Sequence, residues 1–181
     1  QGKYYEKLNY AVGESHEPGS TFKLMAMVRA LEDKVIDTSD VIDTKNGILS
    51  FYGRKVRDSK KGGYGKISAA RAFEVSSNTA LVQIINDNYQ DKPEKFVEGL
   101  FDMKINTPLG LPILGEGVPK FTHPNDKVNW DGLDLPWMAF GYGISLTPLQ
   151  TLTFYNAIAN NGVMVKPRFI KEVKPVSYTH L

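Results

Sequence analysis

The feature that most constrains this fold is the stretch 17–23 (Glu-Pro-Gly-Ser-Thr-Phe-Lys), which leads directly into a strongly apolar segment. From residue 21 to residue 32, apolar side chains recur at helical spacing, which predicts a well-buried helix. Ser20 and Lys23 stand three residues apart at the start of this helix, so they lie one turn apart on the same face. The sequence therefore brings an amine within reach of a hydroxyl.

This pair has the parts of a nucleophile and its base. A serine hydroxyl is a poor nucleophile until a nearby base takes its proton. Lys23 can be that base only if burial or nearby positive charge lowers its pKa, and the positive end of a helix acts in that direction. Each residue alone has a simpler explanation, because Ser20 fits a helix cap and Lys23 fits a solvated surface position.

The composition excludes several classes of function. The net charge of +2 is too small to indicate nucleic-acid binding, and the Lys and Arg residues are scattered along the sequence. The absence of cysteine excludes disulfides and thiolate chemistry. The three histidines lack metal-ligand spacing, so we expect no metal and no cofactor. No apolar run is long enough to predict a membrane span.

The order of the predicted elements indicates one α+β domain, with helices segregated between strand pairs. Beyond the first helix, we expect helices over 68–75, 79–88, 93–103 and 147–160. We expect strands over 41–44, 48–52, 55–58 and 171–173. Residues 105–137 are rich in Gly, Pro, Asn and Asp, which predicts a long irregular loop in which Trp130 and Trp137 serve as packing anchors.

A second polar motif, Ser76-Ser77-Asn78, lies between two of the predicted helices. A hydroxyl and a carboxamide two positions apart at a helix junction can both face one cleft. Asn78 offers a donor and an acceptor suited to a peptide amide, and Ser76 can relay a proton between amines.

The two motifs together resemble the penicillin-recognising serine enzymes, whose motifs are S-x-x-K, S-x-N and K-T-G or K-S-G. Residues 17–23 are similar to the active-site motif of monofunctional class B penicillin-binding proteins, most of all the septal cell-division type. Residues 76–79 and 141–150 resemble further stretches of that family, and the loops resemble those of Bacteroidota proteins. The resemblance runs from about residue 10 to residue 174.

The resemblance implies the transpeptidase fold shared with serine β-lactamases, an antiparallel sheet flanked by helices. It implies a D,D-transpeptidase that cross-links peptidoglycan stem peptides and binds β-lactams covalently. Ser20 would then be the nucleophile and Lys23 the base for acylation. Ser76 would carry the proton to the leaving group, and Asn78 would hold the amide carbonyl of the substrate.

One motif of the family is missing, because no Lys-Thr-Gly or Lys-Ser-Gly triplet occurs in the sequence. We therefore expect residues 1–175 to be a C-terminally truncated transpeptidase domain that is weakly active or inactive. We expect residues 176–181 to be a non-native tail, since they match a translated sequencing adapter. The family further implies an N-terminal anchor absent from this sequence, a place on the periplasmic face of the inner membrane, and divisome proteins and a membrane-embedded glycan polymerase as partners.

Two alternatives share the first two motifs. A class A β-lactamase needs a glutamate that activates the deacylating water, and Glu94, Glu98 and Glu116 do not sit in the expected Glu-x-x-x-Asn setting. A β-lactam sensor domain uses the same serine for signalling, and an upstream membrane-embedded protease in the parent gene would reveal it.

Overall fold

Helix α2 (Lys23–Glu32) runs through the centre of the molecule, directly after the short 3₁₀ helix η1 (Gly19–Phe22). The computed structural model describes residues 2–3, 5 and 7–174. Met25, Ala26 and Ala30 on α2 are fully buried, as expected for a helix whose apolar residues recur at helical spacing. The prediction of a buried helix over 21–32 is confirmed, although its first turn is a 3₁₀ helix.

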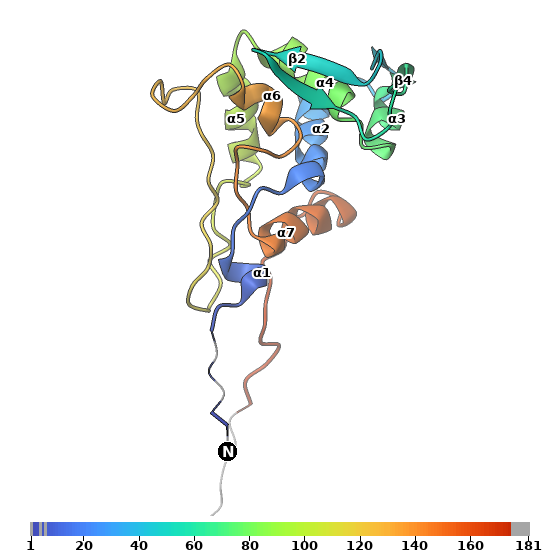
Figure 1. Ribbon diagram of the computed structural model, residues 1–181. Helices are drawn as coiled ribbons and strands as arrows, with labels where there is room; N and C mark the ends of the chain where they lie inside the picture. The colour runs from blue at the N-terminus through green and yellow to red at the C-terminus, as the bar shows by residue number, and fades with distance from the viewer. Residues whose placement is uncertain (1, 4, 6, 175–181) are drawn as a thin grey trace, which may run out of the picture.

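Three further helices surround α2 in the upper part of the molecule (Figure 1). They are α3 (Ala69–Glu74), α4 (Asn78–Tyr89) and α5 (Pro93–Asp102). The hydroxyls of Ser68 and Ser77 accept backbone N–H groups of the first turns of α3 and α4, which fixes where these helices begin. All three match the predicted helices to within two residues at either end.

The strands form two small antiparallel pairs. Strand β1 (Val41–Asp43) pairs with β4 (Lys66–Ser68), and β2 (Ile48–Phe51) pairs with β3 (Arg54–Arg57). Tyr52 and Gly53 join β2 to β3 with positive φ angles of 47° and 80°, as a two-residue hairpin turn requires. Strand β4 was not expected, because it is short and follows a glycine-rich loop.

The lower part of the molecule contains α7 (Pro148–Ala159) and the short helix α1 (Tyr10–Gly13) (Figure 1). Thr147 and Gln150 form a reciprocal capping box at the start of α7. The helix predicted over 147–160 is therefore confirmed. No helix among the described residues is long and apolar enough to cross a membrane.

Two expectations about irregular segments need correction. The long loop 105–137 gives way to helix α6 (Asp134–Met138), which buries Leu135 and Met138. Trp130 and Trp137 pack against the core, as predicted. The strand predicted over 171–173 is wrong, because residues 163–174 pair with no strand in the described part of the chain. The predicted tail 176–181 lies outside the described residues.

The described elements form an α+β fold, as the order of the predicted elements indicated. Its helices and small antiparallel sheets place the two polar motifs on adjacent elements: the first at the start of α2 and the second at the start of α4.

Candidate active site

The centre of the site is the amine of Lys23, whose residue is only 1% exposed. Its Nζ donates hydrogen bonds to the carbonyl oxygen of Ser76 at 2.6 Å, to the Oγ of Ser76 at 2.9 Å and to the Oδ1 of Asn78 at 2.6 Å. A protonated lysine has three protons to donate, so all three are used. The simpler reading of Lys23 as a solvated surface residue is wrong.

Burial also changes the acidity of this amine. Desolvation lowers the pKa of Lys23 from its ordinary 10.5 to about 8, while the negative charge of Asp58 acts in the opposite direction. A lysine with this pKa is partly neutral near pH 7 to 8, so it can accept a proton.

Ser76 and Asn78 approach Lys23 from the junction between α3 and α4. Ser76 has a φ of 55°, in the left-handed region that side-chain-bearing residues rarely adopt. This backbone conformation accompanies the contact of both its carbonyl and its hydroxyl with the same amine. The Nδ2 of Asn78 donates to the carbonyl of Arg57 on β3 at 2.7 Å, which holds the carboxamide in place.

Asp58, directly after β3, anchors the second motif and was not singled out from the sequence. Its carboxylate accepts from the hydroxyl of Ser77 at 3.0 and 3.1 Å, from the backbone N–H of Thr79 at 2.9 Å and from the Thr79 hydroxyl at 2.8 Å. Ser77 and Thr79 are fully buried. The only sequence signal was an acidic residue in a predicted strand, with nothing to say that it would meet residues about 20 positions later.

Ser20 lies on η1 and is exposed, unlike Lys23. The residue that caps η1 is Pro18, and no side chain makes a capping hydrogen bond there, so Ser20 is not a helix cap. Among the described residues, no hydrogen bond engages the Oγ of Ser20. The structure thus brings Lys23, Ser76 and Asn78 into direct contact and places Ser20 one turn before Lys23 with its hydroxyl unengaged.

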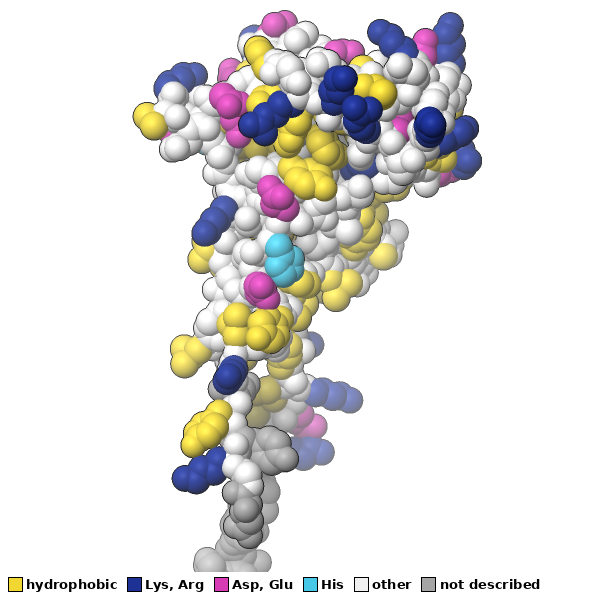
Figure 2. Space-filling view, viewed as in Figure 1, with side chains coloured by type: hydrophobic (Ala, Val, Ile, Leu, Met, Phe, Trp, Pro, Cys, Tyr) yellow, Lys and Arg dark blue, Asp and Glu magenta, His cyan; other side chains and the backbone are white. Residues whose placement is uncertain are grey.

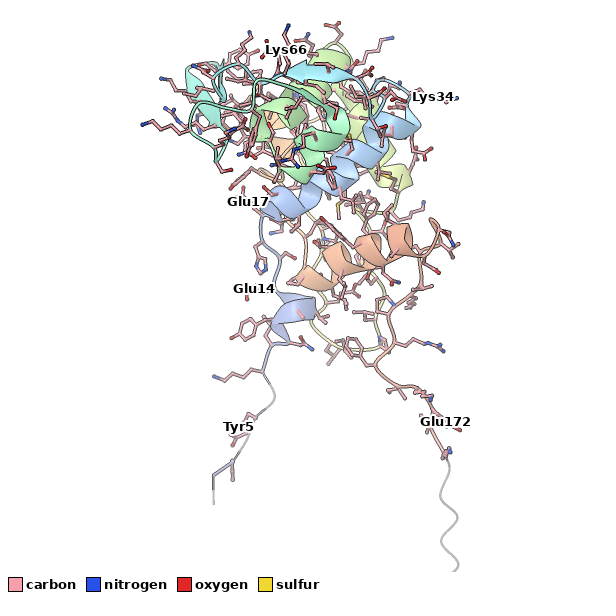
Figure 3. The ribbon with its side chains drawn as sticks, turned by 90° about the vertical axis from the view of Figure 1, so that its right-hand side faces the viewer. Tyr5, Glu14, Glu17, Lys34, Lys66 and Glu172 are labelled. Atoms are coloured by element: carbon pink, nitrogen blue, oxygen red, sulfur yellow. The ribbon has the colours of Figure 1, made fainter. Side chains whose placement is uncertain are left out.

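Backbone contacts with a distant loop hold the other side of Ser20. The N–H of Gly19 donates to the carbonyl of Gly141 at 3.0 Å, and Glu17 accepts from the N–H of Gly143 at 2.9 Å. A Cβ on Gly141 would lie 2.1 Å from the carbonyl oxygen of Gly19, so only glycine fits there. Glu17 lies near the start of α2, and Lys34 lies near the other end of that helix (Figure 3). The upper and lower parts of the molecule meet near Glu17.

This arrangement combines an exposed hydroxyl, a buried amine of lowered pKa, a second hydroxyl and a carboxamide. Such a set can activate a serine, move its proton and orient an amide, which is the chemistry of serine–lysine acyl transfer. The described residues include no group of three or more His, Asp or Glu side chains that could hold a metal ion.

Comparison with known proteins identifies the family. The family model of the penicillin-binding protein transpeptidase domain matches residues 1–180, so the chain belongs to this family. The Bacteroidota resemblance of the loops stays a prediction, as does the assignment of roles to Ser20, Lys23, Ser76 and Asn78.

The curated relatives include bacterial proteins that match most of this chain. Over 165 residues the chain is 31% identical to penicillin-binding protein PbpB of Mycolicibacterium smegmatis, covering 90% of this chain and 24% of that protein. Over 156 residues it is 28% identical to the peptidoglycan D,D-transpeptidase FtsI of Buchnera aphidicola, covering 86% and 25%.

A solved structure shows the same fold. The crystal structure of penicillin-binding protein 3 of Mycobacterium tuberculosis, complexed with aztreonam, matches with a TM-score of 0.75 and 29% identity. The match covers 90% of this chain and 35% of the solved chain. The chain spans about a quarter of the length of the curated relatives described above.

Proposed function

We propose that this chain provides the acylating part of a peptidoglycan D,D-transpeptidase, with Ser20 as the nucleophile and Lys23 as its base. The single observation that carries the proposal is the buried amine of Lys23, which donates to Ser76 and Asn78 one turn from an exposed serine. The family membership and the printed name of the Buchnera relative support it.

In the proposed acylation, a neutral Lys23 takes the proton of the Ser20 hydroxyl as its Oγ attacks the carbonyl of the penultimate D-Ala of a stem peptide. With a pKa of about 8, roughly a tenth of the Lys23 amines are neutral at pH 7. The peptide C–N bond breaks, and Ser76 passes the proton from Lys23 to the leaving amine of the terminal D-Ala. The backbone N–H of Ser20 donates to the developing oxyanion.

The acyl-enzyme then has one productive fate. An amine of a neighbouring stem peptide attacks the ester carbonyl, Lys23 and Ser76 take up its proton, and the Oγ of Ser20 leaves with a proton restored. Asn78 holds the amide of the acyl chain through both steps, since its carboxamide is fixed by Arg57. A β-lactam enters the same acylation step, but the amine released when its ring opens stays tethered to the acyl group and blocks the approach of a second amine, so the acyl-enzyme persists.

The relatives are cell-wall proteins by name, which supports a site of action outside the cytoplasm. We further propose septal duty on the periplasmic face of the inner membrane, with divisome proteins and a glycan polymerase as partners. The basis for this finer proposal is the resemblance of residues 17–23 to the septal type.

The test is covalent labelling with a fluorescent penicillin, applied to the gene product that carries this sequence in full. We expect intact-mass analysis to find one penicilloyl adduct and peptide mapping to place it on Ser20. Ser20→Ala should abolish labelling, while Ser50→Ala, a matched change at another exposed serine, should leave it intact. An adduct on another residue would contradict the proposal, and release of the label within seconds would instead indicate a β-lactamase.

A further inference from the structure

Basic residues gather in one part of the molecule, although the sequence suggested that they are scattered. Residues 45–66 contain seven Lys and Arg residues and one carboxylate, a net charge of +6, so the rest of the chain carries −4. All seven basic residues are exposed: Lys45, Arg54, Lys55, Arg57, Lys60, Lys61 and Lys66. Figure 2 shows Lys and Arg side chains clustered over the end of the molecule that carries β2, β3 and β4.

The charge of this region is not neutralised by its own carboxylate. The oxygens of Asp58 point inward and accept from Ser77 and Thr79. Within the described part of the chain, none of the seven basic side chains forms an ion pair with a carboxylate. Like charges held close together on a surface repel one another, so the region gains stability when it meets a negative partner.

A hollow lies within this basic region. Its volume is about 210 Å³, and it is lined by residues 46–48 and by residues 57–62, which run from the end of β3 into the glycine-rich loop. The polar and charged residues that line it are Asn46, Arg57, Asp58, Ser59, Lys60 and Lys61. The hollow is therefore large enough for a side chain and is lined by three cations.

The hollow borders the candidate active site directly. The carbonyl of Arg57 accepts from the carboxamide of Asn78, and Asp58 holds the first turn of α4. Arg57 and Asp58 therefore belong both to the surroundings of the second motif and to the lining of the hollow. A flat membrane surface cannot enter a hollow of this kind, whereas an extended peptide can follow it.

We propose that this hollow, with Lys60 and Lys61 at its rim, binds a free carboxylate of the peptide substrate and draws anionic peptides toward Asn78. The inference rests on the proposed function, because it takes the occupant of the site to be a peptide. It assigns that peptide a chemical property, a negative side-chain or α-carboxylate group placed beside the amide that Asn78 holds.

The test measures binding by the 181-residue chain, with no acylation step. The probes are a synthetic pentapeptide, L-Ala-γ-D-Glu-L-Lys-D-Ala-D-Ala, with its glutamyl α-carboxylate free, and the same peptide with that carboxylate amidated. Binding is followed by the backbone amide NMR signals of residues 57–61 and 76–79. We expect the free acid to shift both sets of signals and to bind about fivefold more tightly than the amidated peptide.

Two double variants separate position from net charge. Lys60→Gln/Lys61→Gln should lower the affinity for the free acid about fivefold, to the level of the amidated peptide. Lys34→Gln/Lys92→Gln removes the same two charges from exposed positions outside the hollow and should change little. Thermal melts establish that each variant is folded, and Lys61→Gln alone serves if the first double variant is not.

Three results would overturn the inference. The first is equal binding of the free acid by the two double variants, and the second is an equal effect of the amidated peptide on residues 57–61. The third is no shift of residues 57–61 with millimolar free acid while phosphatidylglycerol vesicles bind through Lys60 and Lys61. Failure of the proposed function is distinguished by a different measurement, the absence of a penicilloyl adduct on Ser20.

Discussion

The two sides of the candidate site are built in different ways. On one side, side chains carry the structure: Lys23 meets Ser76 and Asn78, and Asp58 holds the helix behind them. On the other side, backbone carries it, since Gly19 and Gly141 touch with no side chain between them. The stability of the first side should therefore depend on the charges of Lys23 and Asp58. The stability of the second side should depend on the absence of a side chain at residue 141.

The two reactive groups, the amine of Lys23 and the hydroxyl of Ser20, differ greatly in exposure to solvent. The amine of Lys23 is buried against Ser76 and Asn78, and burial lowers its pKa, whereas Ser20 is exposed on the short helix η1. A site of this design keeps its base protected and its nucleophile accessible.

Adding a side chain where Gly19 and Gly141 touch should destabilise the fold. Gly141→Ala places a Cβ 2.1 Å from the Gly19 carbonyl oxygen at a φ of 87°, and we expect it to lower the free energy of unfolding by about 4 kcal/mol. Gly143→Ala is the matched control, because its φ is 71° but no atom lies within 4 Å of the added Cβ. It should cost about 1 kcal/mol. Urea unfolding measures both, and equal losses would refute the steric argument.

Removing the carboxylate of Asp58, which anchors the second motif, should also destabilise the fold. Asp58→Ala leaves the buried donors of Ser77 and Thr79 without a charged acceptor, and we expect a loss of about 3 kcal/mol in urea unfolding. Asp58→Asn keeps one carbonyl acceptor and should lose about half as much. A loss as small as that of an exposed aspartate, such as Asp91→Ala, would show that Asp58 is not an anchor.

Because folding lowers the pKa of Lys23, the free energy of unfolding should depend on pH. Its pKa is about 8 in the folded state and near 10.5 when unfolded, so the unfolded state binds more protons between these values. Stability contributed by this group should therefore rise with pH across that window. Lys23→Met lacks the effect, so the difference in unfolding free energy between the two proteins should change from pH 8 to pH 10. Parallel curves would contradict the lowered pKa.

A direct titration links that prediction to Asp58. The negative charge of Asp58 raises the pKa of Lys23, so Asp58→Asn should move the titration of the Lys23 amine to lower pH. The ¹³Cε chemical shift of Lys23 reports this titration. An unchanged or higher midpoint would show that the two groups do not interact electrostatically.

The smallest effect is expected at the outer edge of the site. The hydroxyl of Tyr155 on α7 donates to the carbonyl of Thr21 at 3.0 Å, in an exposed position. Tyr155→Phe removes this bond and should cost no more than about 1 kcal/mol, because water replaces the lost partner. Tyr142→Phe, at another exposed tyrosine for which the structure gives no hydroxyl hydrogen bond, provides the baseline for the same thermal melts.

The parts of the molecule that sequence reasoning predicted are those governed by local signals. The serine caps at Ser68 and Ser77 and the Thr147–Gln150 box start helices within a few residues of their own position. The resemblance to the penicillin-recognising enzymes implied that Lys23, Ser76 and Asn78 serve one site, and the structure brings their side chains into contact. These features depend on a short stretch of chain or on a familiar pattern.

The features that were missed depend on partners far away in the sequence. Asp58 gained its role only because β3 lies beside the start of α4, and no periodicity in residues 55–58 encodes that neighbour. Strand β4 exists because β1 is available to pair with it. The strand expected over 171–173 finds no partner strand among the described residues.

The hydrogen bond between Glu17 and Gly143 joins residues 126 positions apart, and that between Tyr155 and Thr21 spans 134. The bonds of Lys23 to the second motif span only 53 and 55. During synthesis from the N-terminus, Lys23 can therefore meet Ser76 and Asn78 while residues 141–143 are still inside the ribosome. Closing the longer loop costs more chain entropy and comes later. The contacts of Lys23 with Ser76 and Asn78 therefore form first, and the long-range contacts on either side of Ser20 form last.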